Sequence, residues 1–298
     1  MTSVAARHGD RPGAAWAAPG VAFFTLFAVV PMVLVGYLSL TAWNGLGSPR
    51  FVGVENWSRL VQDPVLRNSL WLSAVLTALT WVIQTPISLL LGVWAAGRQR
   101  NRAVLSAIFF LPLLLSSAAI AIIWKTLLDP NFGLISVVGP WIGLPDGNFI
   151  GTSRGAMICV AFAAAWQFIP FHALLYQGGT RQIPASLYEA ATIDGAGRYR
   201  QLRHITLPQL RNTIISSSVL MIVGALTFFD TVLIMTQGGP GTDTDIVPYR
   251  MYVTAFKSYD MGYGSAIAFA LVLVTTAVSL LLVRLSGFGA MRSTREGM

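Results

Sequence analysis

One ionisable side chain, Asp230, stands inside a long apolar segment and directly follows Phe228 and Phe229. A carboxylate beside aromatic rings suits a sugar-binding site. The carboxylate accepts hydrogen bonds from the hydroxyls of the sugar, and the rings pack on its C–H faces. Ionisable residues within membrane-spanning segments usually face a cavity or a partner, which favours a functional role. The alternative for Asp230 is a polar contact between two helices.

We expect Phe228, Phe229 and Asp230 to line a substrate pathway. Pro170 should kink the apolar segment that contains it. We also expect His172 and Gln84 to form hydrogen bonds between helices.

The residue types that catalysis or metal binding needs do not cluster in this sequence. Its three histidines stand at positions 8, 172 and 204, and one carboxylate lies in the apolar segments. A phosphate-binding loop needs Gly-Lys-Ser/Thr, and neither Lys125 nor Lys257 follows a glycine. The single cysteine, Cys159, excludes an intramolecular disulfide, and we expect it to be buried. The chain is therefore predicted to be non-catalytic, without a cofactor or metal site of its own.

The composition places these residues in a membrane. The 298 residues are 54% hydrophobic and 11% charged, whereas soluble domains carry about 25% charged residues. A spanning helix needs about 20 mostly apolar residues. Six segments qualify: 21–41, 69–96, 104–124, 155–178, 214–236 and 265–283. Their continuous apolar character predicts an all-α integral membrane protein, because the strands of a membrane barrel would alternate apolar and polar residues.

The basic residues predict the orientation. With both termini in the cytoplasm, thirteen of the twenty Arg and Lys residues lie on the inside. Most of the net charge of +8 is then a topology signal and an attraction to anionic lipid, not a nucleic-acid footprint. We expect a flexible cytoplasmic segment 1–18, a membrane domain 19–285 containing an inside loop 181–211, and a cytoplasmic tail 286–298.

The outer loops are too short for a large folded domain. The second, 129–154, is predicted to hold a short helix near 134–138. The third opens with Gly238-Gly239-Pro240-Gly241, a strong turn signal. We find no pair of matching broken helices, which would indicate an inverted-repeat secondary transporter.

The inside loop 181–211 is polar and Arg-rich, yet it carries helix and turn signals. Pro184 suits the first turn of a helix, and a capping box that begins at Ser186 offers an alternative start. Ala190 and Ala191 share a slim face with Leu187, which a partner could approach closely. Asp194-Gly195 is a turn signal, with Gly195 free to adopt a positive φ.

A second short helix is expected over 198–205, with its arginines on the polar side: Arg198, Arg200 and Arg203. Pro208 should limit its continuation. The loop is therefore predicted to be a helix–turn–helix finger that docks a partner at the cytoplasmic surface.

This loop resembles the EAA loop of permease subunits of bacterial ABC importers. The resemblance rests on Tyr188-Glu189-Ala190-Ala191, Asp194-Gly195-Ala196 and Ile205-x-Leu207-Pro208. Other pieces are similar to the carbohydrate branch and its maltose-permease-F-like subunit: Phe51-Val52-Gly53, Asn56-Trp57, Trp124 with Gly133-Leu134-Ile135, and Thr236-Gln237-Gly238-Gly239-Pro240. Together they cover the chain from about residue 19 to residue 284. Leu202 stands where an aromatic residue is common and Asn212 where a second proline is common, so Leu202 would pack less deeply against the ATPase.

The resemblance implies a type I ABC importer permease with six transmembrane helices, in the bacterial cytoplasmic membrane. It implies four partners: a maltose-permease-G-like second permease, a dimer of ATPase subunits that binds ATP and Mg, a solute-binding lipoprotein, and a sugar substrate. The residues that couple to the ATPase would be Tyr188, Glu189, Ala190, Ala191, Asp194, Gly195, Ala196, Leu202 and Pro208. Just before and after Pro170, Gln167, Phe168 and Phe171 resemble the family's substrate-facing helix and would join the substrate pathway. Ordinary helix packing is the alternative for each of these three taken singly. ATP-driven closure of the ATPases would then alternate access to the substrate by a rigid-body movement.

Two alternatives remain open from the sequence. An importer of glycerophosphodiesters or another polar solute would favour Arg or Lys in the cavity, and the spans contain none, although the second permease could supply the charge. An ion-coupled secondary transporter would usually carry several intramembrane carboxylates, and the spans contain one.

Overall fold

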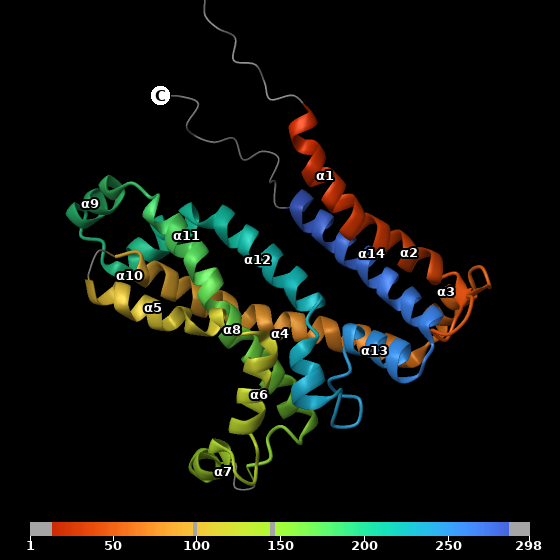
Figure 1. Ribbon diagram of the computed structural model, residues 1–298. Coiled ribbons are helices and arrows are strands. Elements are labelled where there is room, and N and C mark those ends of the chain that lie inside the picture. The colour runs from red at the N-terminus through yellow and green to blue at the C-terminus, as the bar shows by residue number, and fades with distance from the viewer. Residues whose placement is uncertain (1–13, 98–99, 144–146, 286–298) are drawn as a thin grey trace, which may run out of the picture. The chain divides into compact units, whose positions relative to one another are not determined.

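The computed structural model describes residues 14–97, 100–143 and 147–285. Within these ranges the chain is helical, apart from one two-stranded hairpin and the connecting loops (Figure 1). Two units make up the chain: Met1–Val61 with Thr254–Ala270, and Gln62–Val253 with Leu271–Met298. The predicted tail 286–298, and the predicted amino-terminal segment as far as residue 13, lie outside the described residues.

Four of the described helical segments are long and apolar enough to cross a membrane: Ala18–Leu38, Pro64–Ala95, Ser153–Arg181 and Met261–Arg284. Two pairs of helices also qualify but bend between their halves. Ala107–Leu114 meets Ser117–Leu127 at 104°, and Arg198–Gln209 meets Arg211–Leu226 at 69°. If each pair counts as one crossing, the number is six, the number predicted from the sequence. The second pair contains residues 198–209 of the inside loop, so it is not the predicted span 214–236. The predicted spans 104–124 and 214–236 are each interrupted by non-helical residues.

The first unit begins with a helical run formed by η1 (Ala14–Ala17), α1 (Ala18–Phe24), η2 (Thr25–Val29) and α2 (Val30–Leu38). An antiparallel hairpin of β1 (Thr41–Ala42) and β2 (Arg50–Phe51) follows, and then α3 (Glu55–Gln62). The buried Asn56 holds these pieces together, because its amide nitrogen donates to the carbonyls of Ser39 at 3.0 Å and Thr41 at 2.8 Å.

The last span, α14 (Met261–Leu285), starts against this hairpin. The amide of Gly262 donates to the carbonyl of Trp43 at 3.1 Å. A Cβ atom on Gly262 would lie 2.0 Å from the carbonyl oxygen of Thr41, so this close approach requires glycine.

The second unit is built on the crossing of α4 (Pro64–Ala95) and α8 (Ser153–Arg181), with α12 (Arg211–Leu226) packed on α4 (Figure 1). A Cβ on Gly92 of α4 would lie 2.6 Å from both the Ala173 carbonyl oxygen and the Tyr176 Cβ. Small residues permit such contact between helices in membranes. At the same end, Gln177 donates to the carbonyl of Ala95 at 2.9 Å and satisfies one of the last carbonyls of α4.

The third span is broken between α5 (Arg100–Leu114) and α6 (Ser117–Leu127). The break follows Pro112, and the hydroxyl of Ser116 caps α6 by accepting from the Ala119 amide at 3.2 Å. The two halves qualify as a membrane span only when they are taken together, so hydropathy reports the length of the apolar segment and not its continuity.

The fifth span is broken where α12 ends. Thr227 and the two residues after it are not helical, and helix resumes at Asp230 and continues into η5 (Val232–Thr236). The Thr227 hydroxyl donates to the carbonyls of Val223 at 3.3 Å and Gly224 at 3.1 Å. A side chain that bonds back to its own helix in this way competes with continuation of the helix.

The outer loops follow the sequence closely. The predicted short helix is α7 (Leu134–Val138), which continues into η3 (Gly139–Ile142). The predicted turn is present, with φ of +82° at Gly238 and +57° at Gly241. After it, α13 (Val247–Tyr252) and η6 (Val253–Lys257) lead towards α14.

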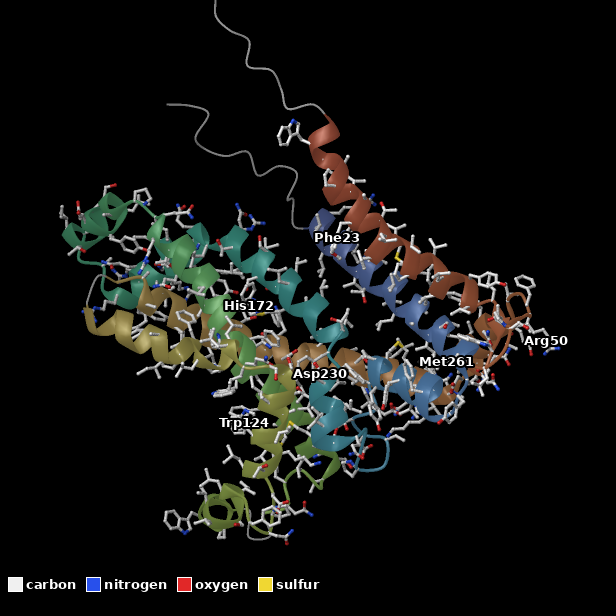
Figure 2. All side chains as sticks on the ribbon, in the orientation of Figure 1. Phe23, Arg50, Trp124, His172, Asp230 and Met261 are labelled. Carbon is white, nitrogen blue, oxygen red and sulfur yellow. The ribbon has the colours of Figure 1, made fainter. Side chains whose placement is uncertain are left out.

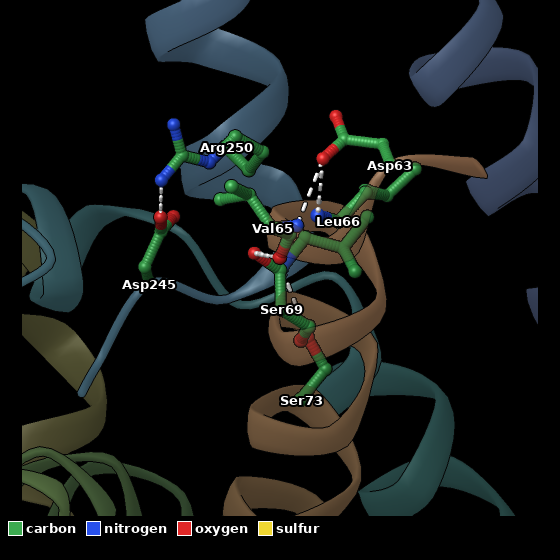
Figure 3. A network of polar contacts seen from close by, with 8 residues as sticks. Asp63, Val65, Leu66, Ser69, Ser73, Asp245 and Arg250 are labelled. Carbon is green, nitrogen blue, oxygen red and sulfur yellow. Dashed lines mark hydrogen bonds and ion pairs between the residues drawn. The ribbon is translucent and has the colours of Figure 1, made fainter. Parts of the chain in front are cut away.

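One hydrogen bond joins this third outer loop to α4, and an ion pair within the loop lies close by (Figure 3). The amide of Val247 donates to the Ser73 hydroxyl at 3.0 Å, and the buried Asp245 pairs with Arg250. Asp63 caps the start of α4 by accepting from the amides of Val65 and Leu66. The loop is therefore held by α4 as well as by its own turn.

Candidate coupling element and membrane cavity

The inside loop forms two helical arms. The first is α9 (Ala185–Ile193), and Pro184 stands at its N-cap, one residue before the predicted first turn. The alternative start at Ser186 is not used, because the helix has already begun and no side chain caps it. The carbonyl of Pro184 accepts from the Leu187 amide at 3.2 Å.

The turn after α9 is set by Gly195, whose φ is +73°. The amide of Ala196 donates to the carbonyl of Ala191 at 2.8 Å, and that of Gly195 to Thr192 at 3.1 Å. These two bonds define a Schellman motif, which satisfies the free carbonyls at a helix end. The turn predicted at Asp194-Gly195 is confirmed.

The second arm, Arg198–Gln209, is made of α10 (Arg198–Gln201), η4 (Leu202–Thr206) and α11 (Leu207–Gln209). It is longer than the predicted 198–205. The arm ends at Gln209, one residue after Pro208, and the 69° bend follows, so Pro208 lies where the continuation of the helix is limited, as predicted. The three predicted arginines are exposed: Arg198, Arg200 and Arg203.

Side chains tie the two arms together. The hydroxyls of Tyr188 and Thr206 are 2.9 Å apart. Gln201 donates to the Thr192 hydroxyl at 3.1 Å and to the Ala196 carbonyl at 3.0 Å. The arms therefore form one element, the coupling element (residues 184–209), in place of two independent helices.

The coupling element joins two membrane helices in the chain. It follows α8, which ends at Arg181, and leads through the bend at Leu210 into α12. A Cβ on Gly179, near the end of α8, would lie 2.8 Å from Leu210 and 2.9 Å from the Thr213 hydroxyl, and Leu210 is fully buried. The end of α8 therefore packs against the start of α12.

The predicted coupling residues divide by exposure. Glu189, Ala190, Asp194, Gly195 and Pro208 are exposed, whereas Tyr188, Ala191, Ala196 and Leu202 are half-buried. Ile193 is 87% exposed and adds an apolar side chain to the outer end of α9. The element thus presents a carboxylate, a slim alanine surface and an apolar side chain to solvent.

A cavity of about 300 Å³ lies within the second unit, between α4, α5, α8 and α12. Three of the six predicted pathway residues line it: Phe168, Phe171 and Phe228. The rings of Phe168 and Phe228 meet edge to face, with centroids 6.4 Å apart. The cavity is thus mainly apolar and aromatic, as small-molecule sites usually are.

The other three predicted pathway residues lie elsewhere. Gln167 is buried and donates to the Leu115 carbonyl at 3.4 Å and the Ser117 hydroxyl at 3.2 Å, at the break of the third span. Phe229 packs in the core, its ring 5.4 Å from that of Tyr252. Asp230 is exposed where helix resumes after the second break (Figure 2), and it does not line the cavity.

The polar groups of the cavity come from residues that sequence reasoning did not assign to it: Thr80, Gln84 and His172. His172 makes the interhelical bond predicted for it, with Nδ1 2.9 Å from the Ser217 hydroxyl, while the buried Gln84 lines the cavity. One signal could have found Thr80 and Gln84. The buried face of α4 carries small or polar residues at helical spacing within an apolar span: Ser69, Ser73, Thr80, Gln84, Ser88 and Gly92.

The buried Cys159 is free and packs with Ala121, Ala163 and Met235, as expected for a small apolar residue. Among the described residues, no group of three His, Cys, Asp or Glu side chains could hold a metal ion.

Comparisons with known proteins agree on one family. A family model described as "Binding-protein-dependent transport system inner membrane component" matches residues 88–288. The probable ABC transporter permease protein PH1215 of Pyrococcus horikoshii is 33% identical over 88% of this chain and 94% of its own length. The diacetylchitobiose uptake system permease protein NgcF of Streptomyces coelicolor is 30% identical, over 93% of this chain and 83% of its own.

The fold matches a solved transporter. A chain of a bacterial alginate ABC transporter, in complex with an alginate pentasaccharide-bound periplasmic protein, has a TM-score of 0.81 to this chain. The two are 21% identical, and the match covers 94% of this chain and 95% of that one. At this identity the likeness concerns the fold.

Proposed function

Because the chain belongs to the family of inner-membrane components of binding-protein-dependent transport systems, we propose that it forms half of the path by which a sugar or oligosaccharide enters the cell. It is a multi-pass permease subunit of an ABC importer, and ATP hydrolysis belongs to a separate ATPase. The resemblance predicted from the inside loop is therefore confirmed, and so is the type I importer fold.

A saccharide is the cargo that the cavity chemistry favours. The cavity combines three phenylalanine rings with the polar side chains of Thr80, Gln84 and His172, which suits apolar C–H faces and hydroxyls. In the described part of the chain, no Arg or Lys lines it, which argues against a phosphodiester. The relative named for diacetylchitobiose uptake points to the same class of cargo.

The pathway proposed here differs in part from the sequence prediction. Phe168, Phe171 and Phe228 contact the cargo in the cavity. Asp230 lies exposed at the break of the fifth span, where the cargo or the second permease can contact it. Gln167 and Phe229 position these residues by holding the helices that carry them.

The observation that carries the coupling role is the exposed α9 face on an element that connects α8 to α12, whose adjoining ends pack together. Glu189 and the alanines dock into a cleft of the ATPase, and the Schellman turn at Gly195 fixes the angle between the arms. Closure of two ATPase copies, which bind ATP and Mg, then moves α8 and α12 and alternates access to the cavity. A second permease completes the path, and an extracytoplasmic solute-binding lipoprotein delivers the cargo.

Reconstitution with the neighbouring gene products tests this proposal. Co-purification should recover a second permease and an ATPase, and proteoliposomes should take up labelled diacetylchitobiose in an ATP-dependent manner. Recovery of this chain alone, or uptake of a glycerophosphodiester in place of saccharides, would contradict the proposed complex or the proposed cargo.

Two proline variants test the coupling element within that assay. Gly195→Pro cannot adopt the φ of +73° that the turn needs, because proline fixes φ near −65°, and it should abolish uptake while leaving membrane insertion intact. Gly197→Pro is the matched control, because Gly197 already has a φ of −68°. Glu189→Ala should uncouple ATP hydrolysis from transport in the same way. Normal uptake in both Gly195→Pro and Glu189→Ala would remove the coupling assignment.

A further inference from the structure

An open groove of about 450 Å³ lies in the first unit, apart from both the coupling element and the membrane cavity. Three stretches of chain line it: the β1–β2 hairpin, α3, and Tyr259–Asp260 just before α14. With cytoplasmic termini, these stretches lie beyond the outer ends of the first and last spans. Arg50 and Met261 mark this region in Figure 2. The groove therefore opens to the side from which cargo arrives.

Bonds between the stretches fix the shape of the groove. Arg59 of α3 pairs with Asp260 at 2.6 Å, and its guanidinium lies 4.0 Å from the centre of the Tyr263 ring. In the hairpin, the Trp43 ring nitrogen donates to the Gly47 carbonyl at 3.1 Å. A groove held in this way needs little ordering when it binds a ligand.

Tyr259 is the unusual residue of the groove. Its φ is +54°, in the left-handed region that side chains other than glycine, asparagine and aspartate rarely adopt. Its side chain is nevertheless large, and 68% of the residue is exposed. Residues with strained backbone often cluster at ligand-binding sites. At this position the strained backbone of Tyr259 places its aromatic ring in the wall of a polar groove.

The remaining polar groups favour a neutral ligand. Within residues 14–97, 100–143 and 147–285, the exposed side chains of Arg50 and Glu55 make no hydrogen bond or ion pair. The Arg50 guanidinium only donates hydrogen bonds, and the Glu55 carboxylate only accepts them. The two arginines of the groove are balanced by Glu55 and Asp260, so it has no net charge to attract an anion.

We propose that this groove is an outer binding site for a saccharide unit of the cargo, an inference that rests on the proposed function. Tyr259 packs on the apolar face of the sugar ring. Arg50 donates to its hydroxyl oxygens and Glu55 accepts from its hydroxyl groups. The site would hold cargo at the outer surface, separately from the membrane cavity.

Saturation-transfer NMR with diacetylchitobiose tests the site on the assembled importer in nanodiscs, without solute-binding protein or ATP. Tyr259→Asn removes the ring and keeps the backbone, because asparagine accepts a positive φ. It should weaken the dissociation constant about tenfold, the loss expected for one good contact, and Arg50→Ala should do the same. Phe132→Asn, which removes an exposed ring from the second outer loop, is the matched control and should bind as the unaltered protein does.

Three results would overturn the site. One is unchanged binding by both groove variants while the importer still takes up the saccharide, which would leave the proposed function standing. Another is loss of the NMR signal in Phe228→Ala but not in Tyr259→Asn, which would place all binding in the membrane cavity. The third is weakened capture of the solute-binding protein with unchanged saccharide binding, which would make the groove a protein contact. If the importer takes up no saccharide at all, the proposed function fails first.

Discussion

The Gln167 side chain, predicted to contact the substrate, instead donates a hydrogen bond to a backbone carbonyl. Its amide stands beside aromatic residues and a proline, the pattern expected of a sugar site. The structure instead directs it to the carbonyl of Leu115, which the break in the third span leaves without a helical partner. The sequence could not distinguish these roles, because the break itself was not predicted.

Replacing Gln167 with leucine should therefore affect stability before it affects cargo recognition. The change removes two donated bonds, to the Leu115 carbonyl and the Ser117 hydroxyl, and each such bond contributes about 0.5–1.5 kcal/mol. The thermal unfolding temperature of the purified subunit complex should fall in Gln167→Leu and be largely retained in Gln167→Asn, which keeps a donor. An unchanged unfolding temperature in Gln167→Leu would show that the break does not depend on this bond.

Asp230 leads to the opposite expectation. The side chain is exposed in this chain, so its removal takes nothing from the packing of the described helices. Asp230→Ala should lower saccharide uptake, by about tenfold if one charged hydrogen bond to the cargo is lost, and leave the yield of assembled complex unchanged. Loss of assembly would instead assign the carboxylate to a polar contact between helices, which was the alternative from the sequence.

At the scale of elements, the sequence predicted correctly those turns and helices that are determined by a few neighbouring residues. The turn at Gly195 and the helix at 134–138 were predictable, because a positive φ and a short apolar stretch between glycines act over a few residues. The breaks near Ser116 and Thr227 were not predictable, because partners distant in sequence or back-bonded hydroxyls stabilise them. The second arm is longer than predicted because helix continues from Thr206 through α11 and ends only after Pro208.

The contact between α4 and α8 gives a prediction about elements. A methyl group at Gly92 would lie 2.6 Å from the carbonyl oxygen of Ala173, so the backbones of α4 and α8 would have to move apart to accommodate it. Gly92→Ala should destabilise the permease by about 1–3 kcal/mol, the usual cost of overpacking, despite the better helix propensity of alanine. Gly178→Ala is the control, because no atom lies within 4 Å of the added methyl group. Equal unfolding temperatures for the two variants would contradict the close approach.

At the scale of the whole molecule, hydropathy predicted six crossings but not which of them are bent. The cavity was predicted only in its aromatic half, because the helical spacing of small and polar residues along α4, which marks its buried face, was not used. The family of the chain could nevertheless be predicted from one inside loop of about thirty residues. The turn and the exposed face that a docking element needs do not depend on the cargo that the membrane helices carry.

Alternating access can be tested at this scale, because the chain carries a single native cysteine and that cysteine is buried. In a Cys159→Ala background, Gly224→Cys places a thiol at the cavity wall, where no atom lies within 4 Å of its Cβ. Closure of the ATPases should change its labelling by a polar maleimide about tenfold or more, because labelling follows the population of the open state. Ala161→Cys, at a fully buried position, is the control and should remain unlabelled with and without ATP and vanadate. Labelling of Gly224→Cys at one rate in every nucleotide state would mean that the cavity is not the path whose access alternates.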